Sequence, residues 1–195
     1  MRFRLAAAAA VLAVLAGCGA PDELSRDHAI ALGNARERLD DAIDTAETLR
    51  TSPRETRRIR REIRRIVARG YFETNELDEF GLAALGELQQ VIPSVVETDA
   101  DGVPEDLDRG ALRAFLRFSQ SDPKRALVGP AGDEVGTIAK TIEDSGADGD
   151  TRVPTRNGES IKDQTVDEVL RTAERDLKPI WPHLADRLDS VRDGL

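Results

Sequence analysis

The sequence beyond residue 22 predicts an all-α fold, an up-and-down helical bundle of about five main helices. Apolar residues recur at steps of three and four along most of it, which is the spacing of one helix face. Aromatic residues are scarce, with five Phe, one Tyr and one Trp, so the core must consist mainly of Leu, Ile, Val and Ala. Two Ser/Thr-x-x-Glu patterns also mark helix starts.

The first 17 residues have the layout of a signal peptide. Arg2 and Arg4 form a short positive region, and an uncharged run of Ala, Val and Leu follows from Leu5 to Leu15. This run is shorter than the roughly 20 apolar residues that a membrane-spanning helix needs. We therefore expect residues 1–17 to be cleaved from the mature chain.

The tetrapeptide Leu15-Ala16-Gly17-Cys18 resembles the lipobox of bacterial lipoproteins. The resemblance covers about the first twenty residues. It implies that Cys18 becomes the lipidated N-terminus, that residues 18–22 form a tether, and that the protein is held on the extracytoplasmic face of the cell membrane. Cys18 is the only cysteine, so we expect no disulfide within the chain.

Composition limits the function of the mature chain. Without residues 1–17, 26 basic side chains stand against 37 acidic ones, a net charge of about −11. This excess favours solubility and argues against a general polyanion binder, and we expect no nucleic-acid partner. The length fits one helical domain over 23–195. No Gly-x-Ser-x-Gly, phosphate loop or dinucleotide fingerprint occurs, and we expect no cofactor.

The first two helices follow from periodicity and capping. The first, 23–49, has apolar positions at Leu32, Ala35, Leu39, Ala42, Ala46 and Leu49. The second, 53–69, begins with a capping box between Ser52 and Glu55 and ends before Gly70. Because only three residues link them, we expect an antiparallel hairpin.

The middle of the chain predicts three further helices. The third begins near Asn75, has Phe80 on its apolar stripe, and is kinked or ended by Pro93. An acidic loop over 98–108 leads into a fourth helix, which reaches about residue 119. A short helical turn ends at Gly129-Pro130, and a fifth helix covers 133–144.

The last part of the chain begins with the least helical stretch, an irregular loop at about 146–163. Asn157-Gly158 favours either a small hairpin or a surface loop there. A capping box between Thr165 and Glu168 then opens a final helix that extends to about residue 191. Pro179 and Pro182 predict a bend or a break in it.

The second helix carries the strongest functional signal in the mature chain. It has eight arginines, and all but Arg60 fall within an arc of roughly 140°. The arginines expected to bind an anionic surface are Arg57, Arg58, Arg61, Arg64, Arg65 and Arg69. The partner could be lipid headgroups, an anionic wall polymer or an acidic envelope protein. Alternatively, acids of the first helix or solvent neutralise this face.

The acidic loop contains weak candidates for a metal site. Asp99, Asp101 and Asp106 lie in a stretch that resembles the calcium loops of thrombospondin type 3 repeats, which implies carboxylate ligands for Ca²⁺. The stretch lacks one Asp-Gly step and occurs once. The alternative is a polar loop in which Asp106 caps the next helix. We expect no metal.

The leading functional hypothesis is a non-enzymatic binding or scaffolding module of the cell envelope, anchored to the membrane by lipid. Two alternatives come from other classes. A small-ligand or cation-binding lipoprotein would use a pocket between helices. An accessory wall hydrolase would use paired carboxylates.

Overall fold

The computed structural model describes residues 19–69, 79–99, 101–154 and 164–195, and it confirms the all-α class. The signal peptide, Cys18, Gly70 and the Asn157-Gly158 turn lie outside the described residues. Within them the chain forms eight α-helices, one 3-10 helix and a two-stranded hairpin. The elements are α1 (Arg26–Thr51), α2 (Pro53–Val67), α3 (Glu79–Val91), η1 (Pro93–Val95), β1 (Val96–Thr98), β2 (Pro104–Leu107), α4 (Arg109–Phe118), α5 (Pro123–Ala126), α6 (Val128–Ser145), α7 (Val166–Leu177) and α8 (Pro182–Arg192).

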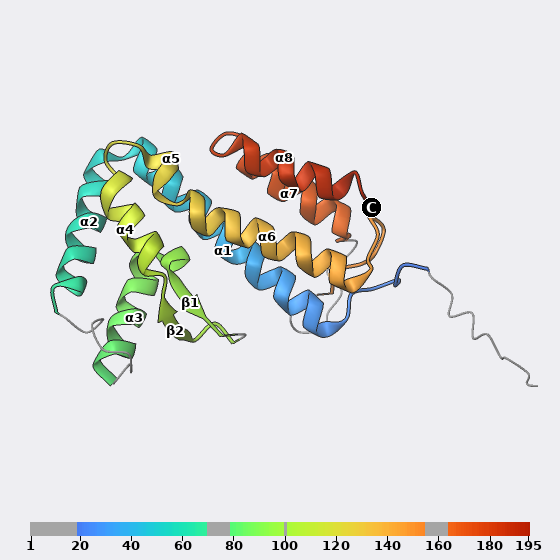
Figure 1. Cartoon of the computed structure of the whole chain (residues 1–195), viewed down its shortest axis with the longest axis horizontal. Coiled ribbons are helices and arrows are strands. Elements are labelled where there is room, and N and C mark those ends of the chain that lie inside the picture. The colour runs from blue at the N-terminus through green and yellow to red at the C-terminus, as the bar shows by residue number, and fades with distance from the viewer. Residues whose placement is uncertain (1–18, 70–78, 100, 155–163) are drawn as a thin grey trace, which may run out of the picture.

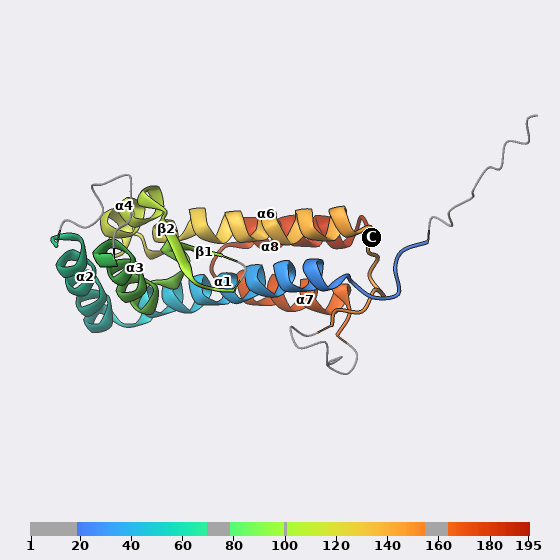
Figure 2. The same ribbon diagram turned by 90° about the horizontal axis from the view of Figure 1, so that it is seen from below.

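Four helices form a long up-and-down bundle. α1 runs away from the start of the described chain, α6 returns beside it, and the antiparallel pair α7 and α8 packs against them (Figures 1 and 2). All six predicted apolar positions of α1 are buried. Three of these positions are alanines, which let neighbouring helices approach α1 closely. None of the described helices is both long enough and apolar enough to cross a membrane.

The remaining elements, α2 to α5 and the hairpin, gather at the far end of α1 (Figure 1). The hairpin is a correction to the acidic loop expected over 98–108. Its strands β1 and β2 are antiparallel, with Val96 opposite Leu107. Both of these side chains are buried, so this cross-strand pair anchors the two short strands to the core.

The connection between α1 and α2 does not form the expected antiparallel hairpin. Ser52 alone links the helices, and α2 crosses the end of α1 instead of returning along it (Figures 1 and 2). A short link limits the distance between two helix ends but leaves the crossing angle to packing. The basic helix therefore lies at the end of α1 that is far from residue 19 (Figures 1 and 2).

Both helix starts predicted from capping boxes are observed. Thr165 and Glu168 form the complete box at α7. At α2, the Ser52 hydroxyl accepts from the Glu55 backbone N–H at 3.4 Å. The Glu55 side chain instead accepts hydrogen bonds from Arg58, so only half of the predicted box forms there.

Prolines mark three of the remaining boundaries. α6 begins at Val128 rather than at the expected residue 133, because Pro130 lies in its first turn, where a missing N–H costs no hydrogen bond. The final helix breaks, as expected, between Leu177 and Pro182. Its two halves then fold back on each other as α7 and α8.

Two further expectations about side chains are wrong. Phe80, expected on the buried stripe of the third helix, is 62% exposed. Asp108 rather than Asp106 caps α4, and its side chain accepts from a backbone N–H in the first turn of that helix.

The segment before α1 is fastened to the bundle by backbone hydrogen bonds. The Leu24 N–H donates to the Arg152 carbonyl at 2.9 Å, and the Arg152 N–H donates to the Asp22 carbonyl at 3.1 Å. The buried Thr151 hydroxyl donates to the Pro21 carbonyl at 2.9 Å. Part of the predicted tether is therefore fixed to the fold, and the described chain is held against the bundle from Pro21 onward.

Trp181 joins the α7–α8 turn to the elements at the far end of α1. Its indole Nε1–H donates to the Lys124 carbonyl at 2.6 Å, and its side chain is buried. We expect Trp181→Phe to lower the free energy of unfolding by about 2 kcal/mol, because it removes a hydrogen bond and leaves a small cavity. Urea denaturation, monitored by far-ultraviolet circular dichroism, measures this change in the free energy of unfolding. The exposed Phe80→Leu is the control, and equal stability of the two variants would contradict this role of Trp181.

Candidate functional site

The arginine face predicted on α2 is formed because the opposite side of the helix is buried. Ile59, Ile63 and Ile66 point into the core together with Thr56. This burial turns the predicted arginines outward, and the structure brings all of them to one exposed face: Arg57, Arg58, Arg61, Arg64, Arg65 and Arg69. Arg54 is exposed on the same face.

Half of this face is neutralised by ion pairs. The nitrogen–oxygen distances are 2.8 Å for Arg58 with Glu55, 2.9 Å for Arg65 with Glu62 and 2.8 Å for Arg69 with Glu87. The glutamates belong to α2 and α3, so the expected alternative that acids of the first helix would do this is wrong. Two acids of α1 pair with arginines of α1 itself, Asp40 with Arg36 and Glu47 with Arg50.

The other half of the face has no such partners. Within the described ranges, four exposed arginines of this face form neither an ion pair nor a side-chain hydrogen bond, and we call them the arginine stripe: Arg54, Arg57, Arg61 and Arg64. At 100° per residue they fall within about 80° of helix surface. They extend over about 15 Å of α2.

Arg60 adds a buried positive charge beneath this surface. It is only 8% exposed, and its Nη1–H donates to the Leu116 carbonyl of α4 at 2.5 Å and to the Ser119 hydroxyl. No carboxylate pairs with it in the part of the chain that the structure describes. Burial and then the charge of Arg64 lower the pKa of Arg60, but a guanidinium stays protonated at neutral pH.

A second basic row on α4 was missed by the sequence reasoning. The Arg60 contact places α4 against α2, and every charged side chain of α4 is an arginine. Arg113 and Arg117 are exposed one turn apart, and Arg117 lies over the Phe118 ring at 5.1 Å. The sequence signal for this row was available, because arginines recur every four residues in a helix without acidic residues.

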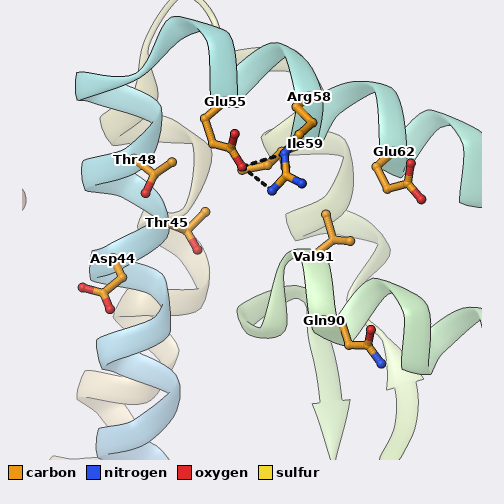
Figure 3. A pocket seen from close by; sticks show the side chains of 9 residues that line it. All are labelled: Asp44, Thr45, Thr48, Glu55, Arg58, Ile59, Glu62, Gln90 and Val91. Atoms are coloured by element: carbon orange, nitrogen blue, oxygen red, sulfur yellow. Dashed lines mark hydrogen bonds and ion pairs between the residues drawn. The ribbon is translucent and has the colours of Figure 1, made fainter.

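A groove of about 570 Å³ lies where α1, α2 and α3 meet (Figure 3). The carboxylates of Asp44, Glu55 and Glu62 line it, and the Arg58 side chain points toward Glu55. A hydrogen bond from Arg65 lowers the pKa of Glu62. Glu62 is therefore ionised at neutral pH and is not a proton donor.

The candidate metal ligands have separate local roles. Asp99 Oδ1 accepts from the Asp101 N–H at 2.9 Å and the Val103 N–H at 2.8 Å, which closes the turn of the hairpin. Asp106 lies in β2 and accepts from the Leu107 N–H. No group of three possible metal-ligating side chains is found among the described residues.

Comparisons with protein-family models, with curated proteins and with solved structures found no significant match. The arrangement of the helices and arginines instead defines the structural class of the protein. The described chain is an elongated all-α bundle with α2 and α4 at its far end (Figures 1 and 2). These two helices carry exposed arginines, some of which are neutralised by glutamates.

Asp41 makes a pH dependence of stability testable. Burial, followed by the charges of Glu37, Asp44 and Asp40, raises its pKa. The folded state thus holds this proton more tightly than the unfolded state, and its ionisation removes stability as pH rises from about 4 through the raised pKa. Because the carboxyl is half-exposed, we expect Asp41→Asn to add only about 0.5 kcal/mol at pH 7 and nothing near pH 3.

Unfolding free energies measured by urea denaturation between pH 3 and pH 7 test this expectation. Asp186→Asn, at an exposed position of α8, is the control and should leave the pH profile unchanged. A destabilised Asp41→Asn at pH 7 would show that its carboxylate makes a favourable contact.

Proposed function

We propose that the chain is a lipid-anchored extracytoplasmic lipoprotein that acts as a non-enzymatic binding module of the cell envelope. Its arginine stripe, with the row on α4, binds an extended anionic polymer. The observation that carries this proposal is the stripe itself, four like charges without partners among the described residues in a chain of net charge −9. Clustered like charges repel each other, and a bound polyanion would relieve that repulsion.

The position of the stripe favours a partner away from the anchoring membrane. The lipid proposed on Cys18 directly precedes the described chain, which is held on the bundle from Pro21 onward. α1 then extends for 26 residues, about 39 Å, toward the basic end. Headgroup charges act over a Debye length of about 8 Å. In the proposed arrangement the bundle stands upright on its anchor, so headgroups of the same membrane are too distant from the stripe.

The surface chemistry favours a polymer over a folded protein partner. Protein interfaces are usually centred on buried aromatic or aliphatic anchors. In the described chain, the large exposed apolar side chains are Phe80, Leu82, Val103 and Leu195, and none belongs to α2 or α4. A polymer with repeating negative charges needs only the arginines.

The two alternative functions have less support. A ligand pocket is usually apolar with a few polar groups, whereas charged and polar side chains form most of the lining of the groove between α1, α2 and α3. A carboxylate hydrolase needs one protonated carboxyl group facing a second carboxylate. In this groove Glu62 is held ionised by Arg65, and Glu55 is engaged by Arg58.

The lipid anchor gives the first prediction of this function. Mass spectrometry of the membrane fraction should find a mature chain that begins at Cys18 and carries an added lipid mass. Cys18→Ser should move the protein out of the lipidated fraction, because the thiol is the attachment point. An intact Met1, or a chain beginning at Cys18 without lipid mass, would contradict the anchor.

The arginine stripe gives the second prediction. We expect Arg54→Gln/Arg61→Gln/Arg64→Gln to weaken binding to polyphosphate and to polygalacturonate by about 100-fold at low salt. The reason is that each arginine at an anionic surface contributes about 1 kcal/mol. Binding is measured by fluorescence anisotropy of labelled polymers, and the difference should shrink as salt is added.

The paired arginines provide a matched control. Arg58→Gln/Arg65→Gln/Arg69→Gln removes the same number of charges but leaves the stripe intact, and it should weaken binding by less than about tenfold. Equal losses in the two triple variants would mean that net charge alone drives binding. Preference of the wild type for anionic vesicles over both polymers would refute the polymer as partner.

A further inference from the structure

A smaller hollow of about 300 Å³ lies at the corner where α1 passes into α2, beside the turn before α5. Its lining residues are Leu49, Arg50, Pro53, Thr56, Arg57, Ser119, Gln120 and Pro123. None of them is acidic, whereas three carboxylates line the larger groove. In an acidic chain, a hollow without acidic lining residues is a place where an anion meets little repulsion.

The hollow has an exposed rim and a buried floor. Arg50, Arg57 and Gln120 are exposed and offer hydrogen-bond donors at the rim. Arg50 also pairs with Glu47 at 2.9 Å, whereas Arg57 belongs to the arginine stripe and has no ion pair in the described ranges. Thr56 and Ser119 are buried in the floor.

Arg60 places a positive charge directly behind this floor. Its Nη1–H donates to the hydroxyl of Ser119, which lines the hollow. An ion as buried as this one usually has a partner of opposite charge, because its desolvation is otherwise costly. Arg60 has only the Leu116 carbonyl and the Ser119 hydroxyl within the described residues. A bound anion at the rim would supply the missing negative charge.

We propose that this corner hollow binds a phosphate group, with Arg57 and Arg50 as direct donors and Arg60 as the buried positive charge behind them. Guanidinium groups match the several oxygens of a phosphate with paired hydrogen bonds. Since Arg57 is shared with the stripe, one phosphate of a polymer enters the hollow while its neighbours lie along the stripe. The inference rests on the proposed function and narrows the partner to a phosphate-bearing polymer.

The test uses the chain from residue 19 to 195, which contains the hydrophobic core formed by the described residues. It is titrated with inorganic phosphate at constant ionic strength, and backbone amide shifts are followed by NMR. We expect saturable shifts at the start of α2 and around residues 119–123. Arg57→Gln should weaken this binding by about tenfold, the value of one charged hydrogen bond. The neighbouring Arg58→Gln, which removes the same charge outside the hollow, should weaken it less than twofold.

A parallel titration with dimethyl phosphate identifies the source of the group. Binding of both probes supports a phosphodiester within a chain, and binding of inorganic phosphate alone supports a terminal or free phosphate. Absence of saturable shifts, or equal losses in Arg57→Gln and Arg58→Gln, overturns the site. Polymer binding by the stripe would survive that result, so the failure of the hollow is distinguishable from the failure of the proposed function.

Discussion

The burial of α1 along its whole length is the constraint on which the rest of the architecture depends. α6 runs antiparallel to it, and the α7–α8 pair completes the enclosure. With its apolar side covered in this way, α1 has no free apolar surface along which α2 could return. α2 therefore turns at Ser52, packs on α3, and contacts α4 through Arg60. The remote position of the basic helix is thus a consequence of how α1 is buried.

The same packing divides the arginine face of α2 into two halves of different charge. On the side of α3, Glu87 joins the glutamates of α2 and neutralises Arg65 and Arg69. On the side of α4 there is no acid to do the same, because that helix has only arginines among its charged residues. Arginines and glutamates therefore lie together on the side of α3, whereas only arginines lie on the side of α4. On the unpaired half, the binding of an anionic ligand would relieve the repulsion among the arginines and lower the electrostatic free energy.

Local periodicity and capping were readable from the sequence, and tertiary contacts were not. The buried positions of α1, the cap at Ser52 and the exclusion of Arg60 from the arginine arc depend only on spacing along one helix, and all were predicted. The burial of Arg60 was not predicted. The crossing of α1 and α2 and the pairing of Glu87 depend on which helix covers which, and spacing carries no information about that. The exposed Phe80 was misassigned for the same reason.

Ion pairs between helices give the long bundle a fixed register. Arg38 binds Glu134 of α6 at 2.8 Å, and Arg36 binds Asp176 of α7 at 2.6 Å. Sliding of α1 against either neighbour would break a partly buried pair, which costs more than breaking an exposed one. If Cys18 carries the lipid, such a bundle acts as a rigid spacer. It then keeps the arginine stripe at the end of the bundle opposite the proposed anchor, where the proposed polymer would bind.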